Sequence, residues 1–176
     1  MEIASYIVNL IGLGAILLAS LVKGEKMKQV LLLLLVGNLA VGIGYLLGGS
    51  GINGAVSCFV GVGQTVVSAI FEIKHRPVPK WVVGIYALSF IVVNLLFGGV
   101  SFYTFLVIAA CMTFIMGILQ KSGRGYRLWT VGNTVLWSTY DLLTGTYSAL
   151  ITHATMFVVN MAGILIHDLK KKEKGA

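Results

Sequence analysis

Long stretches of this sequence lack fixed charge. No Asp, Glu, Lys or Arg occurs at positions 29–71 or 81–120, and positions 128–167 contain only one such residue, Asp141. A membrane-spanning helix needs roughly 20 predominantly apolar residues. Each stretch of about 40 residues therefore predicts two spans that fold back on one another. Together with a further span at 3–22, these stretches predict seven membrane helices.

Proline is nearly absent, and strand-like patterns are missing. The two prolines, Pro77 and Pro79, lie in the same short link, which predicts a stiff connector between the third and fourth spans. The composition is 57% hydrophobic and the mean hydropathy is +0.93, too apolar for an ordinary soluble domain. Membrane strands would alternate polar and apolar residues, and no such alternation is visible. We therefore predict an all-α membrane protein, with spans near 3–22, 29–47, 52–73, 81–98, 102–120, 127–144 and 147–168.

Residues for catalysis or metal binding are also scarce. The two cysteines, Cys58 and Cys111, lie in predicted spans and are expected to be small packing residues without a disulfide. The three histidines are far apart in the sequence, and no zinc-protease, phosphate-loop or nucleophile-elbow motif occurs. We expect no enzymatic activity, no cofactor and no metal site.

Basic residues are confined to four segments, which predicts the orientation. All 13 Lys and Arg residues lie at 23–28, 74–80, 121–127 and 170–174. With seven spans, these segments share one side of the membrane. The positive-inside rule places that side in the cytoplasm, with the N-terminus outside and the C-terminus inside. The net charge of +7 then reflects insertion bias and anionic lipid headgroups, and we expect no nucleic-acid partner.

The two halves of the chain share a sequence pattern. Val36-Gly37-Asn38, Tyr45 and Leu47 form the pattern V-G-N-x6-Y-x-L, which recurs 95 residues later as Val131-Gly132-Asn133, Tyr140 and Leu142. Each copy lies at the same point of the predicted topology, which favours a parallel duplication. The expected architecture is two parallel three-helix bundles joined by an inverter helix. Its segments are 1–73 (first bundle), 74–100 (cytoplasmic link and inverter), 101–168 (second bundle) and 169–176 (basic cytoplasmic tail).

A 3+1+3 arrangement of parallel repeats resembles the topology of the SWEET and PQ-loop transporters. At the level of residues, nearly the whole chain resembles the YgjV family of bacterial inner-membrane proteins. That resemblance rests on the short Lys-rich link after the first span and on three helix segments. The segments are Tyr45–Gly48, Trp137–Tyr140 and Asn160–Gly163.

The SWEET resemblance implies two substrate-binding residues. An Asn on the third helix of each bundle contacts the substrate in such folds, which implies Asn160 as a ligand and Gln64 in the partner role. The chain departs from that pattern because its first and fifth spans lack the hinge prolines of SWEET-like proteins. The rocking mechanism of those transporters is therefore not implied for this chain.

Polar residues inside the spans are the remaining site candidates, because they normally face the interior of a bundle. Asn38, Asn133 and His153 belong to this group, and His153 shares a helix face with Asn160. Trp137 is predicted near the middle of its span, where it either stacks on a solute or packs the bundle. Interhelical hydrogen bonding is the competing role for each amide.

Asp141 is the only acid within a span, and two interpretations of it stay open. It either reaches water at the outer interface or is buried beside His153. In the second case the carboxylate–imidazole pair could take up and release a proton, which would suit proton or cation coupling.

These features predict a transporter or facilitator of a small neutral polar or weakly cationic solute, such as a sugar, nucleoside or vitamin. It would work by alternating access between the two bundles. Two alternatives stay open: a structural or regulatory inner-membrane subunit without its own substrate, and a lipid-handling membrane protein. The expected partners are the solute and membrane lipids, and a homodimer is compatible with the sequence but not required by it.

Overall fold

The structure, a computed structural model, describes residues 2–21, 27–49, 51–120 and 123–165. These residues form seven helices and no strand, which confirms the predicted all-α class and the predicted number of helices. The basic tail predicted at 169–176 lies outside the described residues. The helices are α1 (Glu2–Leu21), α2 (Met27–Gly48), α3 (Ile52–Ile73), α4 (Lys80–Gly98), α5 (Phe102–Ile118), α6 (Gly123–Thr144) and α7 (Tyr147–Gly163).

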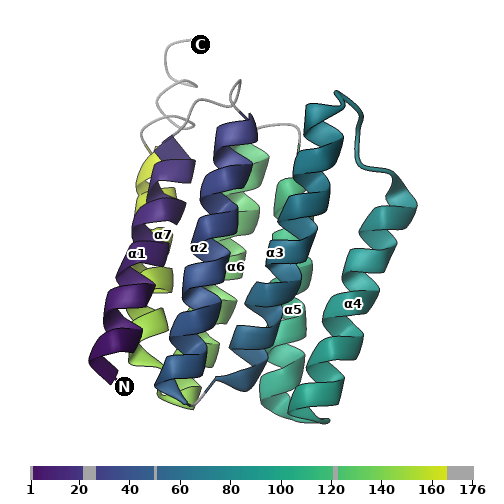
Figure 1. The fold of residues 1–176 in the computed structure, drawn as a ribbon. Coiled ribbons are helices and arrows are strands. Elements are labelled where there is room, and N and C mark those ends of the chain that lie inside the picture. Colours follow the sequence, from purple (N-terminus) through teal and green to yellow (C-terminus); the bar gives the residue numbers. More distant parts are fainter. Residues whose placement is uncertain (1, 22–26, 50, 121–122, 166–176) are drawn as a thin grey trace.

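The turns fall where the sequence predicts them. Gly49, Gly99 and Gly145 have φ values of +74°, +64° and +71°, a region that glycine adopts without steric cost. Each ends a helix at the same end of the bundle, where α1 begins (Figure 1). At the opposite end, Pro79 precedes α4 with φ −65° and ψ 146°. Proline suits that position because its missing N–H would have no partner there.

The helices form two facing rows (Figure 1). In the first row α2 lies between α1 and α3, and in the second row α6 lies between α5 and α7. The rows meet where α1 packs against α7 and α3 against α5, while α4 packs against α3 and α5 at one edge. We use "first row" for α1–α3 and "second row" for α5–α7. The division of the chain into two duplicated bundles and an inverter stays a prediction.

Three helices are both long and apolar enough to cross a membrane within the described part of the chain. They lie at Lys28–Gly48, Ile52–Ile73 and Lys80–Gly98, and shorter apolar helices occur at Ile3–Ala19 and Phe102–Ile118. By contrast, α6 and α7 carry polar residues such as Asn133, Asp141 and His153 along their length. These polar side chains are buried, so they do not contact the surroundings of the bundle.

The distribution of side chains is inverted relative to that of a soluble protein. Large apolar residues such as Leu88, Leu96 and Val158 are more than half exposed, whereas Asn9, Asn94 and Asp141 are at most 1% exposed. Lipid solvates apolar side chains well and polar ones poorly, so a membrane bundle turns its polar groups inward. This pattern supports membrane insertion and shows that the interior contains the polar chemistry.

Glycines allow the first two helices to approach closely. A Cβ atom built on Gly37 would lie 2.4 Å from Ile16 Cγ1, and one built on Gly44 would lie 2.4 Å from Asn9 Nδ2. Gly44 therefore provides the space in which the Asn9 amide is buried. Small residues at helix contacts are the usual solution in membranes, where packing and hydrogen bonding drive association.

Candidate functional site

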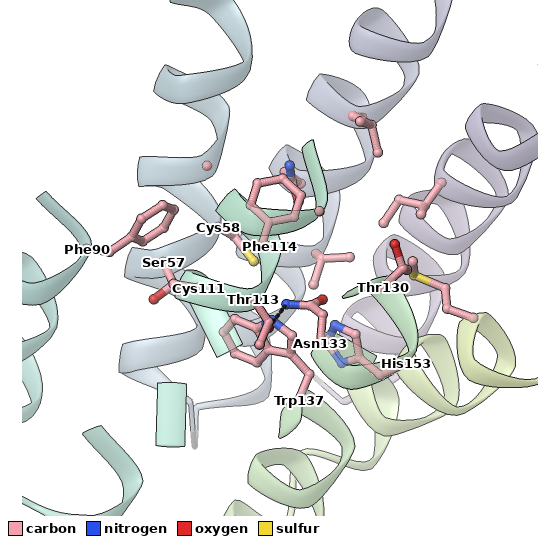
Figure 2. Close-up of a pocket in the computed structure, with 17 residues that line it drawn as sticks. Ser57, Cys58, Phe90, Cys111, Thr113, Phe114, Thr130, Asn133, Trp137 and His153 are labelled. Atoms are coloured by element: carbon pink, nitrogen blue, oxygen red, sulfur yellow. Dashed lines mark hydrogen bonds between the residues drawn. The ribbon is translucent and has the colours of Figure 1, made fainter. Parts of the chain in front are cut away.

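A cavity lies at the centre of the bundle and is lined by side chains from all seven helices (Figure 2). Its volume, measured as the space open to the centres of water molecules, is about 80 Å³. One water needs about 10–15 Å³ on this measure. The cavity therefore has room for several waters or for a solute of a few heavy atoms. Its aromatic lining residues are Phe90, Phe114 and Trp137, and its polar ones are Asn38, Ser57, Thr113, Thr130, Asn133 and His153.

The two asparagines of the repeated pattern both reach this cavity. Asn133 Nδ2 donates to Ala110 O at 2.6 Å and to Thr113 Oγ1 at 3.3 Å, so its Oδ1 is left as an acceptor at the cavity. Asn38 lies across the bundle on α2, and its buried Nδ2 has no hydrogen-bond partner within the described residues. An unpaired amide costs free energy in a dry interior. The Asn38 amide is therefore positioned to bind water or a solute.

An aromatic cluster forms the wall of the cavity nearest the glycine turns. Trp137 stacks on His153 with ring centroids 5.4 Å apart and an interplanar angle of 13°. Its centroid also lies 6.2 Å from that of Tyr45 and 5.7 Å from that of Tyr140. The two tyrosines contact each other edge to face. These rings separate the cavity from the ends of α2 and α6.

Asp141 lies behind this cluster and has no exposed surface. The interpretation that it reaches water at the outer interface is therefore wrong. Asp141 is buried because Tyr45 from the first row and His153 from α7 enclose its carboxylate. His153 Nδ1 lies 2.6 Å from Asp141 Oδ2, and the Tyr45 hydroxyl donates a hydrogen bond to Asp141 Oδ1. The predicted pairing of Asp141 with His153 is present in the structure.

The pairing also determines which His153 nitrogen faces the cavity. Because Nδ1 bonds the carboxylate, Nε2 is left without a partner among the described residues. A neutral His153 would hold its proton on Nδ1 and offer the Nε2 lone pair to the cavity, whereas a protonated His153 would offer an N–H donor. The same nitrogen can thus accept or donate, depending on the charge of the ring.

Hydrogen bonds that join the two rows concentrate at the end where α1 begins. Asn9 Nδ2 donates to Ser148 Oγ at 2.9 Å, and Ser5 Oγ lies 3.0 Å from the same oxygen. On the other side of the bundle, Asn53 Nδ2 donates to Thr104 Oγ1 at 3.0 Å. Together with the Tyr45–Asp141 bond, these contacts form a polar layer between that end of the bundle and the cavity.

Two predicted ligands lie outside the cavity lining. The Gln64 side chain is 2% exposed, and both of its polar atoms lack a hydrogen-bond partner within the described residues. Asn160 Nδ2 donates to Met156 O in its own helix at 2.8 Å. The structure thus brings Asn38, Asn133, Trp137 and His153 to one cavity, with Asp141 behind them. The binding roles of Asn160 and Gln64 stay predictions.

Several cavity residues were not among the candidates predicted from the sequence, and the 95-residue offset could have found two of them. Cys58 precedes His153 by 95 residues, and Cys111 follows Ile16 by the same number. All four residues line the cavity. Both cysteines are free, as predicted. No group of three or more His, Cys, Asp or Glu side chains within the described ranges is arranged to hold a metal ion.

Seven helices with a polar interior and an apolar exterior define a helical membrane protein with a central cavity. Residues 3–171 match the model of the YgjV family of bacterial inner membrane proteins. The chain therefore belongs to this family, as the resemblance implied, and its location is the bacterial inner membrane. No curated protein matches the chain, and neither does any solved structure. The orientation of the termini stays a prediction.

Proposed function

We propose that this protein transports a small solute across the inner membrane by alternating access between its two rows of helices. The observation that carries the proposal is the central cavity, which is lined by every helix and contains amide, imidazole and indole groups. A purely structural subunit has no need of a polar cavity in its interior. Unsatisfied polar groups in such a place cost stability, so a function is their simplest explanation.

The hydrogen bonds support a duplication of the rows. Asn9 of α1 bonds Ser148 of α7, and Asn53 of α3 bonds Thr104 of α5. Adding 95 to 9 and to 53 gives 104 and 148, so the two bonds exchange under the repeat offset. Such exchange is expected when two parallel three-helix units face each other across a two-fold axis along the membrane normal. The packing of α1 on α7 and of α3 on α5 agrees with this symmetry.

The cavity lies on that proposed axis. Four pairs of lining residues are separated by 95 positions, namely Ile16 with Cys111, Asn38 with Asn133, Cys58 with His153 and Gly61 with Met156. A cavity on one side of the molecule would not receive matching positions from both rows. Binding sites at the interface between repeats are the usual arrangement in secondary transporters.

The polar layer supports a closed outer end. With the predicted orientation, the bonds of Asn9, Asn53 and Tyr45 to the second row close the side opposite the cytoplasm.

The lining indicates the class of solute. Among the described residues no Lys or Arg lines the cavity, so a strongly anionic solute would find no counter-charge there. Neutral polar or weakly cationic compounds fit the amide and imidazole groups better. Because the cavity volume is about 80 Å³, a solute as large as a sugar or nucleoside would have to widen it. Trp137 provides an aromatic surface for stacking.

The alternatives make different demands on the structure. A structural subunit would favour a dry, fully packed contact between the rows, and a lipid-handling protein would favour a groove open sideways to lipid. The cavity has polar lining residues and receives side chains from all seven helices. This arrangement favours transport over both alternatives.

A binding screen followed by an uptake assay tests the proposal. Purified protein is screened by thermal stabilisation against neutral and cationic small solutes, and solutes that stabilise it are tested for uptake into proteoliposomes. Trp137→Leu should weaken binding by about two- to tenfold, since an aromatic contact contributes about 0.5–1.5 kcal/mol. Trp81→Leu is the matched control, because Trp81 is 67% exposed at the start of α4.

Two outcomes would redirect the assignment. If no solute class stabilises the protein or accumulates in proteoliposomes, the structural alternative replaces transport. If Asn160→Ala abolishes uptake while Asn133→Ala does not, the substrate contacts Asn160, as the SWEET resemblance implies, and not the lining of the central cavity.

A further inference from the structure

We infer that the cavity holds one positive charge at a time, either a proton on His153 or a small organic cation, so that transport exchanges one for the other. This inference rests on the proposed transport function and adds the substrate class and the coupling ion. The observation that carries it is the juxtaposition of a fully buried carboxylate, its imidazole partner and a cavity whose described lining contains no other basic group.

The Asp141 carboxylate requires a compensating positive charge in its buried position. Asp141 has no exposed surface, and the groups that bond its two oxygens are the Tyr45 hydroxyl and the His153 ring. An ionised carboxylate at such a site costs several kcal/mol unless a positive charge accompanies it. A hydroxyl donor lowers this cost but supplies no charge. A proton on the Asp141–His153 pair makes the pair neutral overall.

Each neighbouring helix presents a side chain toward the Asp141–His153 pair or the cavity beside it. Helix α2 presents Tyr45, α3 presents Cys58, α5 presents Cys111, and α6 presents Tyr140 beside Asp141 itself. Helices α1 and α4 line the cavity with Ile16 and Phe90, which do not titrate. Phenols and thiols do not carry positive charge. Within the described lining, His153 is therefore the only group able to compensate Asp141.

The hydrogen-bond acceptors at the cavity determine which cation can replace the proton. When His153 loses its proton, its Nε2 becomes an acceptor at the cavity, and Asn133 Oδ1 is a second acceptor because Nδ2 is used by Ala110 and Thr113. Acceptors beside an uncompensated carboxylate select a cation with N–H donors. The indole of Trp137 adds a favourable surface for such a cation.

The cavity volume limits the size of that cation. A volume of about 80 Å³ suits methylammonium or guanidinium better than a polyamine. The exchange is balanced: one cation enters the cavity, the N–H proton of His153 leaves to water, and the net charge of the site does not change. No covalent bond other than this N–H bond is made or broken.

Guanidinium and urea provide the decisive comparison, because they have nearly the same shape and differ in charge. Each is added to the purified full-length protein in weakly buffered detergent solution with a pH indicator, and binding is followed by calorimetry. We expect guanidinium to release up to one proton per cation bound, and urea to release none. Because the proton and guanidinium compete for the site, the apparent Kd for guanidinium should rise as the pH falls, by at most about tenfold for each unit of pH.

Variants locate the exchange. His153→Gln keeps a side chain able to bond Asp141 but cannot take up the proton, which then has only the Asp141 carboxylate to bind, so the pH dependence of guanidinium binding should shift. His75→Gln is the matched control, since His75 is exposed in the link between α3 and α4. Asp141→Asn removes the negative charge of the site. Guanidinium binding and the accompanying proton release should therefore both disappear.

Three results would overturn the exchange. These are guanidinium binding that is independent of pH, a pH dependence of binding that is unchanged in His153→Gln, and no guanidinium binding at any pH. If urea or another neutral solute is then bound and transported, the transport function stands and only the exchange fails. If no solute of any class is bound or transported, the transport function itself fails.

Discussion

Tyr45 and Tyr140 provide a sharp test of whether Asp141 is charged in the folded protein. The two residues are 95 positions apart, and their rings pack in one aromatic cluster. Their hydroxyls differ in partner: the Tyr45 hydroxyl donates to the buried carboxyl of Asp141, whereas the Tyr140 hydroxyl accepts from Gly54 N at 3.3 Å. Substituting each by phenylalanine removes the hydroxyl and keeps the ring.

The magnitudes follow from the partners. A hydrogen bond to a charged group contributes about 1.5–3 kcal/mol and a neutral one about 0.5–1.5 kcal/mol. Tyr45→Phe also leaves a buried carboxylate oxygen unpaired. We therefore expect Tyr45→Phe to lower the free energy of unfolding by about 2–3 kcal/mol and Tyr140→Phe by about 0.5–1.5 kcal/mol.

The assay is reversible unfolding in mixed micelles by SDS titration, followed by far-ultraviolet circular dichroism. In a double-mutant cycle, Tyr45→Phe and Asp141→Asn should show a coupling of at least about 1 kcal/mol, because the two residues are in direct contact. Equal losses for the two tyrosine variants, or a larger loss for Tyr140→Phe, would mean that Asp141 is neutral in this network. The site would then hold no negative charge for a proton or a cation to compensate.

Three further predictions test the packing, the orphaned amide and the orientation. Gly44→Ala should cost about 1–3 kcal/mol of stability in the same titration, because its Cβ would lie 2.4 Å from the Asn9 amide. Gly84→Ala is the control, since a Cβ at Gly84 would have no neighbouring atom within 4 Å among the described residues. Its stability should stay within about 1 kcal/mol of that of the unsubstituted protein. Gln64→Leu should raise stability, since it removes two buried polar atoms that have no hydrogen-bond partner in the described part of the chain. A loss of uptake with unchanged stability would instead support the binding role that the SWEET resemblance implies. In a background without Cys58 and Cys111, an impermeant thiol reagent added outside cells should label Val100→Cys but not Lys28→Cys, and the reverse pattern would invert the predicted orientation.

The helices were predictable because lipid imposes a simple rule on the sequence. A helix that crosses a bilayer must exclude charge over roughly 20 residues, and the charge-free stretches therefore mark α2, α3 and α4 closely. The glycine turns were predictable because glycine adopts positive φ without cost, and Gly49, Gly99 and Gly145 all do so. These features depend on local chemistry, which any reading along the chain can detect.

The candidate site was predictable only in part. Polar residues in a span normally face the bundle interior, and this rule found Asn38, Asn133 and His153, which all line the cavity. The rule does not say which buried amides share a cavity and which are used in packing. Asn9, for example, bonds Ser148 from α7, a partner 139 residues away that no local pattern indicates.

The sequence by itself determined the class, the family, the positions of most helices and the inward direction of the polar groups, because each of these depends on composition, spacing and local pattern along one chain. Only the tertiary structure decided that Asp141 is fully buried and pairs with both His153 and Tyr45, and that Gln64 and Asn160 lie away from the cavity lining. Those outcomes depend on which helix packs beside which and at what depth, and contacts between distant helices leave no periodic signal in the sequence.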